Sequence, residues 1–215
     1  MVTCHGEVFG ENLSTLAPPG SQKHADLLRQ RAAAPAAFMA EHAFYPGSAR
    51  AVGFKILHSQ LTAVWPGLLE ALQADREVRV IHLVRRNGLK RFLSEYFVGT
   101  VTCRHQLFDG EAPPVFEPVE LPIPLLLRDL ELRAAQSAGI RDVFARHPFL
   151  EISYEDTLDE SGIAFREALS FLGVPPAPLS AGIRKVLPDD VRRLVTNYAD
   201  IERALAATPY RAFLE

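Results

Sequence analysis

The sequence is poor in cysteine, with only Cys4 and Cys103 among its 215 residues. Two cysteines cannot build a disulfide scaffold or a cysteine-rich metal cluster. No set of histidine, cysteine and carboxylate residues has the spacing of metal ligands either. We therefore expect a protein without a bound metal, and a reducing cytoplasm is the default location.

Long hydrophobic runs and an excess of positive charge are also missing. The apolar runs fall far short of the roughly 20 residues that cross a bilayer, and no signal peptide is recognisable. A net charge of −3 gives no broad electrostatic case for binding nucleic acid. No segment reads G-x-x-x-x-G-K-[ST], which argues against an ordinary P-loop NTPase and makes a nucleotide kinase the weakest alternative.

The segment 78–97, VRVIHLVRRNGLKRFLSEYF, predicts a strand, a turn and a helix. The apolar run Val80–Val84 is typical of a strand buried on both faces of a parallel sheet. Asn87 is a good N-cap, because its side-chain oxygen can accept a free N–H group of the first helical turn. Ser94 follows Asn87 by about two helical turns, so both lie on one side of the helix. The apolar stripe of this helix consists of Leu89, Phe92, Leu93, Tyr96 and Phe97.

Arg85 and Arg86 end the predicted strand where the helix begins, which is a favourable place for an anion. Open α/β sheets bind ligands outside the carboxyl ends of their strands. Guanidinium groups match phosphate oxygens, and the helix N-terminus adds free N–H groups. The alternative is that both arginines are surface charges paired with nearby acids, but the strand, turn, cap and Ser94 together favour an anion site.

This segment resembles the 3′-phosphate-binding motif of the sulfotransferases that use 3′-phosphoadenosine 5′-phosphosulfate (PAPS), in particular their bacterial and carbohydrate- and tyrosylprotein-sulfotransferase-like branch. That motif is a strand ending in arginine, with a serine further on in the next helix. Arg86 and Ser94 have the family spacing, and Arg85 competes with Arg86 for the role. The resemblance implies PAPS as donor and adenosine 3′,5′-bisphosphate as product, without a metal.

The N-terminal segment Cys4-His5-Gly6-Glu7 resembles the family's "CGE" segment, so the resemblance implies that Glu7 is the catalytic base. A carboxylate within reach of an acceptor hydroxyl can take its proton as the oxygen attacks sulfur. The family's first strand and 5′-phosphosulfate loop have no counterpart here. A late start codon, a truncated chain and a shortened, inactive relative are the three explanations, and we favour the first two.

Further residues inherit roles from the resemblance. Lys55 lies near the end of the predicted strand 51–57, where some relatives place a lysine close to the sulfonate. His58 follows it and could contact the acceptor or donor, although a plain polar residue at a strand end is the commoner case. His105 lies in the predicted loop 99–119, which is either an acceptor-binding segment or a surface loop. Lys185, beside Arg184, could reach the 3′-phosphate.

The remaining elements support one α/β domain over residues 1–215. We predict helices over 22–34, 122–147 and 161–172, with Gly173 as a helix C-cap, and a strand over 149–154. The resemblance implies a three-layer, mainly parallel P-loop-NTPase-like sulfotransferase fold. Glu155 is expected to cap or pair within this fold rather than to do chemistry. The tail 185–214 resembles the end of bacterial sulfotransferases and carries one apolar stripe.

The expected activity is therefore transfer of a sulfonate from PAPS to an acceptor hydroxyl on a carbohydrate, lipid or small metabolite. The alternative is an inactive relative that binds a 3′-phosphorylated nucleotide or acts as an interaction module. No nucleic-acid partner is expected. A missing central strand would leave sheet edges exposed, which favours a homodimer.

Overall fold

The computed structural model describes residues 2–10, 13–102, 107–108, 110–112, 114–159, 162–179, 183–184, 186–188 and 190–214. The chain forms two compact units, each built from several segments of the sequence. Unit 1 comprises Met1–His82, Arg141–Glu151 and Ile163–Ala177, and unit 2 comprises Leu83–Ile140, Ile152–Gly162 and Pro178–Glu215. The units are not consecutive stretches of sequence, so the single domain expected over residues 1–215 stays a prediction.

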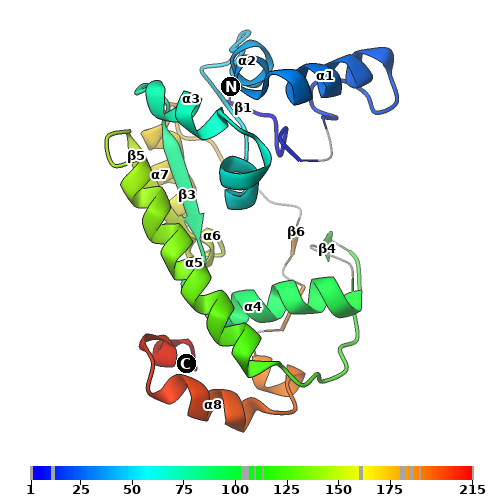
Figure 1. Cartoon of the computed structure of the whole chain (residues 1–215), viewed down its shortest axis with the longest axis vertical. Coiled ribbons are helices and arrows are strands. Elements are labelled where there is room, and N and C mark those ends of the chain that lie inside the picture. Colours follow the sequence, from blue (N-terminus) through cyan, green and yellow to red (C-terminus); the bar gives the residue numbers. More distant parts are fainter. Residues whose placement is uncertain are drawn as a thin grey trace. The chain divides into compact units, whose positions relative to one another are not determined.

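Unit 1 is organised around the ring of Phe9, which is fully buried. This ring contacts the rings of Phe38, Phe54 and Trp65 at centroid distances of 5.8, 5.3 and 5.9 Å. Aromatic rings bury large apolar areas, so this cluster anchors the N-terminal segment. The elements of unit 1 are β1 (Val2–Cys4), α1 (Gln22–Ala33), α2 (Pro35–Phe38), β2 (Ala51–Gly53), α3 (Leu68–Ala74) and α7 (Ile163–Phe171), with π-helical turns at Met39–Ala43 and Gln60–Val64 (Figure 1).

Strands β1 and β2 pair in parallel, with Val2 opposite Ala51. The predicted strand 51–57 is shorter than expected, since β2 ends at Gly53. Hydrogen bonding nevertheless continues, because Lys55 N–H donates to Gly6 O at 2.8 Å. The extended run stops at Leu57, whose N–H donates to the side chain of Gln60 and starts the next turn.

Unit 2 packs its helices around one apolar core (Figure 1). Helix α4 (Gly88–Phe97) contributes Leu89, Phe92, Leu93 and Phe97, as its predicted stripe requires. The other elements of unit 2 are β4 (Leu107–Phe108), α5 (Ile123–Val143, whose last turn belongs to unit 1), α6 (Tyr154–Thr157), β6 (Ile183–Arg184) and α8 (Tyr198–Ala206). The unit also contains a π-helical turn at Val98–Thr102 and 3-10 helices at Val191–Leu194 and Pro209–Leu214.

Strand β3 (Val80–Val84) has the predicted bounds and pairs with β5 (Phe149–Ser153). The expected burial of both its faces is wrong, because Ile81 is 39% and Leu83 58% exposed. Strand residues alternate between two faces, so both side chains point to the same, uncovered side. In the described part of the chain the strands form three separate pairs, β1–β2, β3–β5 and β4–β6. The predicted mixture of helices and strands is confirmed; β1 and β2 pair in parallel, whereas β4 and β6 pair antiparallel.

Two further predictions differ from the structure in detail. Helix α5 ends at Val143, four residues before the predicted end at residue 147. The tail is not one helix, since Val195 pairs as an isolated bridge with Val119. Gly173 caps α7 as predicted: its φ is +69°, and the N–H of Val174 bonds Leu169 O at 2.9 Å.

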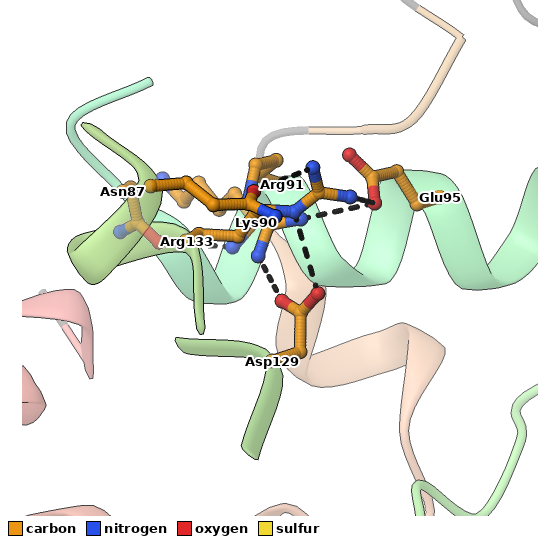
Figure 2. Close-up of polar contacts among 7 residues, drawn as sticks. Asn87, Lys90, Arg91, Glu95, Asp129 and Arg133 are labelled. Carbon is orange, nitrogen blue, oxygen red and sulfur yellow. Dashed lines mark hydrogen bonds and ion pairs between the residues drawn. The ribbon is translucent and has the colours of Figure 1, made fainter. Parts of the chain in front are cut away.

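Figure 2 shows a network of four charged side chains that joins α4 to α5. Arg91 donates to the half-buried Asp129, and Arg133 lies near both Asp129 and Glu95. Arg91 Nη1 lies 3.0 Å from Glu95 Oε2 and forms an ion pair with it. The two groups are not aligned for a hydrogen bond, and this nitrogen has no hydrogen-bond partner among the described residues. Asp129 is therefore the acceptor that holds Arg91.

Replacing Asp129 by asparagine is expected to lower the free energy of unfolding by about 1.5–3 kcal/mol, because the half-buried Arg91 loses the negative charge of its acceptor and keeps only a weaker bond to an amide oxygen. The Asp129 side chain is 16% exposed and that of Glu95 53%. Glu95→Gln is the matched control and should cost less than about 1 kcal/mol, as exposed ion pairs do. Urea unfolding of both variants measures the difference; equal losses would show that burial of Asp129 does not matter.

Within the described residues, no helix is both long enough and apolar enough to cross a membrane.

Candidate functional site

The turn between β3 and α4 has the predicted geometry. Asn87 is extended, with φ −92° and ψ 98°, and its Oδ1 accepts from Lys90 N–H at 2.9 Å. Its amide nitrogen donates to Phe213 O at 3.0 Å. Gly88 lies against Leu130 and Phe213, and a Cβ at this position would come within 2.8 Å of atoms of both side chains. The helix start is thus fixed by the Asn87 cap, by the bond from Asn87 to Phe213 O and by the close packing of Gly88 against Leu130 and Phe213.

A carboxylate of the protein occupies the anion position predicted at this turn. The two oxygens of Glu155 accept from the N–H groups of Arg86 and Asn87, at 3.0 and 3.2 Å. Glu155 is brought there by α6, which begins where the Ser153 side chain caps the chain after β5. The expectation that Glu155 caps or pairs within the fold is confirmed.

Both arginines of the turn contact α6. The Arg85 guanidinium lies over the Tyr154 ring, 4.0 Å from its centroid. Arg86 Nη2 donates to Asp156 Oδ1 at 2.8 Å. Ser94 is half-buried, and among the described residues its hydroxyl forms no hydrogen bond. The structure therefore brings both arginines to one short helix and forms no direct contact between Ser94 and either of them.

The two acids of α6 are held in their charged forms. Burial acts to raise the pKa of Glu155, but backbone N–H groups, those of Arg86 and Asn87 included, and the charge of Arg86 lower it below its ordinary value. The Ser153 hydroxyl lowers the pKa of Asp156, and the Arg86 guanidinium adds to this effect. Two charged carboxylates thus face the predicted phosphate-binding turn.

Glu7 and Lys55, the predicted catalytic pair, lie in unit 1 and contact each other. Lys55 Nζ donates to Glu7 Oε1 at 2.6 Å, and both side chains are partly exposed. The residues follow the paired strands β1 and β2, at the carboxyl end of this two-stranded ladder. An exposed ion pair contributes only about 0–1 kcal/mol, so Glu7 can exchange Lys55 for another hydrogen-bond donor.

The other predicted residues are His58 in unit 1 and two residues outside the described ranges. His58 is half-buried, and its backbone carbonyl accepts from the Thr62 hydroxyl at 2.9 Å. His105 and Lys185 lie outside the described residues, as do Cys103 and Arg104. No group of three or more histidine, cysteine or carboxylate residues within the described ranges could hold a metal ion.

Comparisons with known proteins add no relative. No protein-family model, no curated protein and no solved structure matches this chain.

Two polar features escaped the reasoning from sequence. Asp156 lies two residues after the predicted strand 149–154, and its position beside Glu155 is the signal that could have paired it with Arg86. In unit 1, Glu151 of β5 accepts from Arg141 at 2.7 and 2.8 Å and lies 3.0 Å from His82 Nδ1. Burial lowers the pKa of His82, and the bond to Glu151 opposes this shift. Sequence alone carries no signal for that pairing of strands.

We expect unit 2 to lose stability in acid because of Glu155. Its folded-state pKa lies below its ordinary value of 4.5. The stabilising contribution is therefore complete above about pH 4.5 and is lost as the pH falls through the lower, folded-state pKa.

Urea unfolding between about pH 6 and pH 3 measures this loss of stability, which Glu155→Gln should reduce. Glu117→Gln removes an exposed acid of the same unit and is the control. Parallel pH profiles for wild type and Glu155→Gln would contradict the expectation.

Proposed function

We propose that this chain is a PAPS-dependent sulfotransferase with the three-layer, P-loop-NTPase-like fold of that family. The observation that supports it best is the Glu155 carboxylate, bound by the N–H groups of Arg86 and Asn87. An oxyanion already fits this turn, where a helix N-terminus and a guanidinium favour negative charge. In the proposed complex the 3′-phosphate of the donor replaces Glu155, with Arg86, Arg85 and Ser94 as its ligands.

The proposed reaction uses the pair in unit 1. Glu7 takes the proton of the acceptor hydroxyl, whose oxygen forms a new bond to sulfur as the bond from sulfur to the 5′-phosphate oxygen breaks. Lys55, 2.6 Å from Glu7, is a cation that can offset the charge developing on that oxygen. The products are a sulfate ester and adenosine 3′,5′-bisphosphate. A hydroxyl of a carbohydrate, lipid or small metabolite is the proposed acceptor.

The same carboxylate favours a second candidate, a catalytically inactive relative of the sulfotransferases that acts as an interaction module. If Glu155 is a permanent cap of α4, phosphate cannot enter, because two negative groups would compete for the same N–H donors. The chain would then serve as an interaction module, and Arg86 would be a structural partner of Asp156.

Two measurements on the full chain separate these functions. Calorimetry with adenosine 3′,5′-bisphosphate, against adenosine 5′-monophosphate as the ligand without a 3′-phosphate, tests the turn. Incubation with PAPS carrying a radiolabelled sulfonate and a panel of sugar, lipid and phenolic acceptors tests transfer. Transfer supports the sulfotransferase. Binding without transfer supports an inactive relative that keeps the nucleotide site. The absence of both binding and transfer overturns the sulfotransferase and leaves the interaction module.

Glu155→Gln decides whether the carboxylate competes with the ligand. Loss of its charge should tighten binding of adenosine 3′,5′-bisphosphate about 5-fold, the difference between a charged and a neutral hydrogen bond. Weaker binding by this variant would mean that Glu155 holds the turn in its binding conformation instead.

A further inference from the structure

The segment that carries Glu7, residues 5–10 and hereafter the Glu7 loop, has every backbone carbonyl hydrogen-bonded. Three of these carbonyls bind side chains from other parts of unit 1, and a fourth binds Thr15. The contacts are Thr15 Oγ1 to His5 O at 2.8 Å, Lys55 N to Gly6 O at 2.8 Å, Gly10 N to Glu7 O at 2.8 Å, Arg31 Nη1 to Val8 O at 2.6 Å and to Gly10 O at 2.7 Å, and Trp65 Nε1 to Phe9 O at 2.9 Å. Buried backbone carbonyls are nearly always hydrogen-bonded, and in this loop donors of the protein itself supply every bond.

Arg31 is the central donor of these contacts. It is only 7% exposed, and burial lowers its pKa. A cation near the end of α1 is favourable for the helix dipole, but that effect does not require the guanidinium to be buried. Burying a charge costs free energy unless hydrogen bonds compensate. Val8 O and Gly10 O each accept from Nη1 of Arg31, whereas its Nε has no hydrogen-bond partner among the described residues.

Trp65 completes the arrangement. The Arg31 guanidinium lies over its ring, 4.8 Å from the centroid, so the two donors support each other. The side chains of Val8 and Phe9 are buried below the loop, whereas Glu7 remains partly exposed beside Lys55. The loop is therefore fixed on its inner side and presents one carboxylate outward.

We infer that Arg31 and Trp65 are positioning residues that clamp the Glu7 loop and fix the direction of the Glu7 carboxylate. This inference rests on the proposed function, in which Glu7 is the base. Catalytic geometry is sensitive to small displacements, so a base on a loop needs such fixed support. Neither residue is assigned contact with the substrate.

Two conservative variants of the full chain test the clamp. Trp65→Phe keeps an aromatic ring and removes the N–H donor to Phe9. Arg31→Lys keeps the charge and removes the planar fork. Leu72→Val is the matched control, since it perturbs a buried residue of unit 1 outside the Glu7 loop. Trp65 is the one tryptophan of the sequence, so its emission reports directly on Arg31→Lys.

The first readout is independent of activity. Amide hydrogen exchange at Gly10 and Lys55, whose N–H groups bond within the clamped segment, should accelerate about 3- to 10-fold in both variants. Amides of α3 should keep their rates, and Leu72→Val should leave Gly10 and Lys55 unchanged. Unchanged exchange at both positions, or a uniform increase over all of unit 1, would overturn the clamp.

The second readout tests the role in the reaction. Both variants should lower kcat for sulfonate transfer about 10- to 100-fold while the Kd for adenosine 3′,5′-bisphosphate stays as in wild type. A variant with faster exchange but wild-type kcat shows a merely structural clamp and overturns the positioning role. If wild type transfers no sulfonate, the proposed function and the positioning role both fail, and hydrogen exchange alone still decides whether the clamp exists.

Discussion

Glu7→Gln is expected to lower kcat for sulfonate transfer by about 100- to 10,000-fold, because an amide cannot take the proton of the acceptor hydroxyl. The substitution keeps the length of the side chain and an oxygen that can accept from Lys55. Binding of adenosine 3′,5′-bisphosphate should not change, since its proposed ligands lie at the β3–α4 turn.

Transfer of radiolabelled sulfonate under saturating PAPS measures this effect. Glu70→Gln is the control, because Glu70 is an exposed acid in the first turn of α3. A kcat within a few-fold of wild type for Glu7→Gln would remove Glu7 from the reaction. An equal loss in both variants would point to a general effect of charge instead.

The second large effect is expected at Arg86. Arg86→Ala should weaken binding of adenosine 3′,5′-bisphosphate by about 1.5–3 kcal/mol, or roughly 10- to 150-fold, because a hydrogen bond between charged groups is lost. Calorimetry on the full chain measures the Kd. The N–H group of residue 86 remains in the variant, so some affinity for the phosphate should persist.

Two control variants sharpen this result. Arg85→Ala tests the competing assignment, and a larger loss there than for Arg86→Ala would make Arg85 the main phosphate ligand. Arg203→Ala removes an exposed arginine of the same unit, paired with Asp200, and should leave the Kd unchanged. Equal, small effects of all three variants would mean that no arginine of the turn binds the nucleotide.

Local patterns were sufficient to predict the strand, the turn and the helix that carry the proposed nucleotide site. Asn87, the apolar stripe of α4 and Gly173 each act within a few residues of sequence, so their roles follow from capping and helical periodicity. The bounds of β3 were correct for the same reason. Its burial was not, because burial depends on what the rest of the chain places against the strand.

Long-range pairings could not be predicted in this way. Glu155 binds a turn almost seventy positions earlier in the chain, and Arg31 is held by carbonyl groups that carry no sequence signature. Asn197 joins the main chain of Leu121 through both atoms of its amide. The separate roles of Glu7 and Lys55 were suggested by resemblance alone. Their contact was not predicted, and its catalytic meaning stays a prediction.

The bond from the Asn87 side chain to Phe213 O has a practical consequence for handling the protein. Because residues close to the C-terminal end help to hold the first turn of α4, proteolytic clipping or a bulky fusion there would disturb a site located far upstream in the sequence. Preparations should therefore be checked by mass spectrometry for an intact tail before any failure to bind nucleotide is attributed to the turn itself.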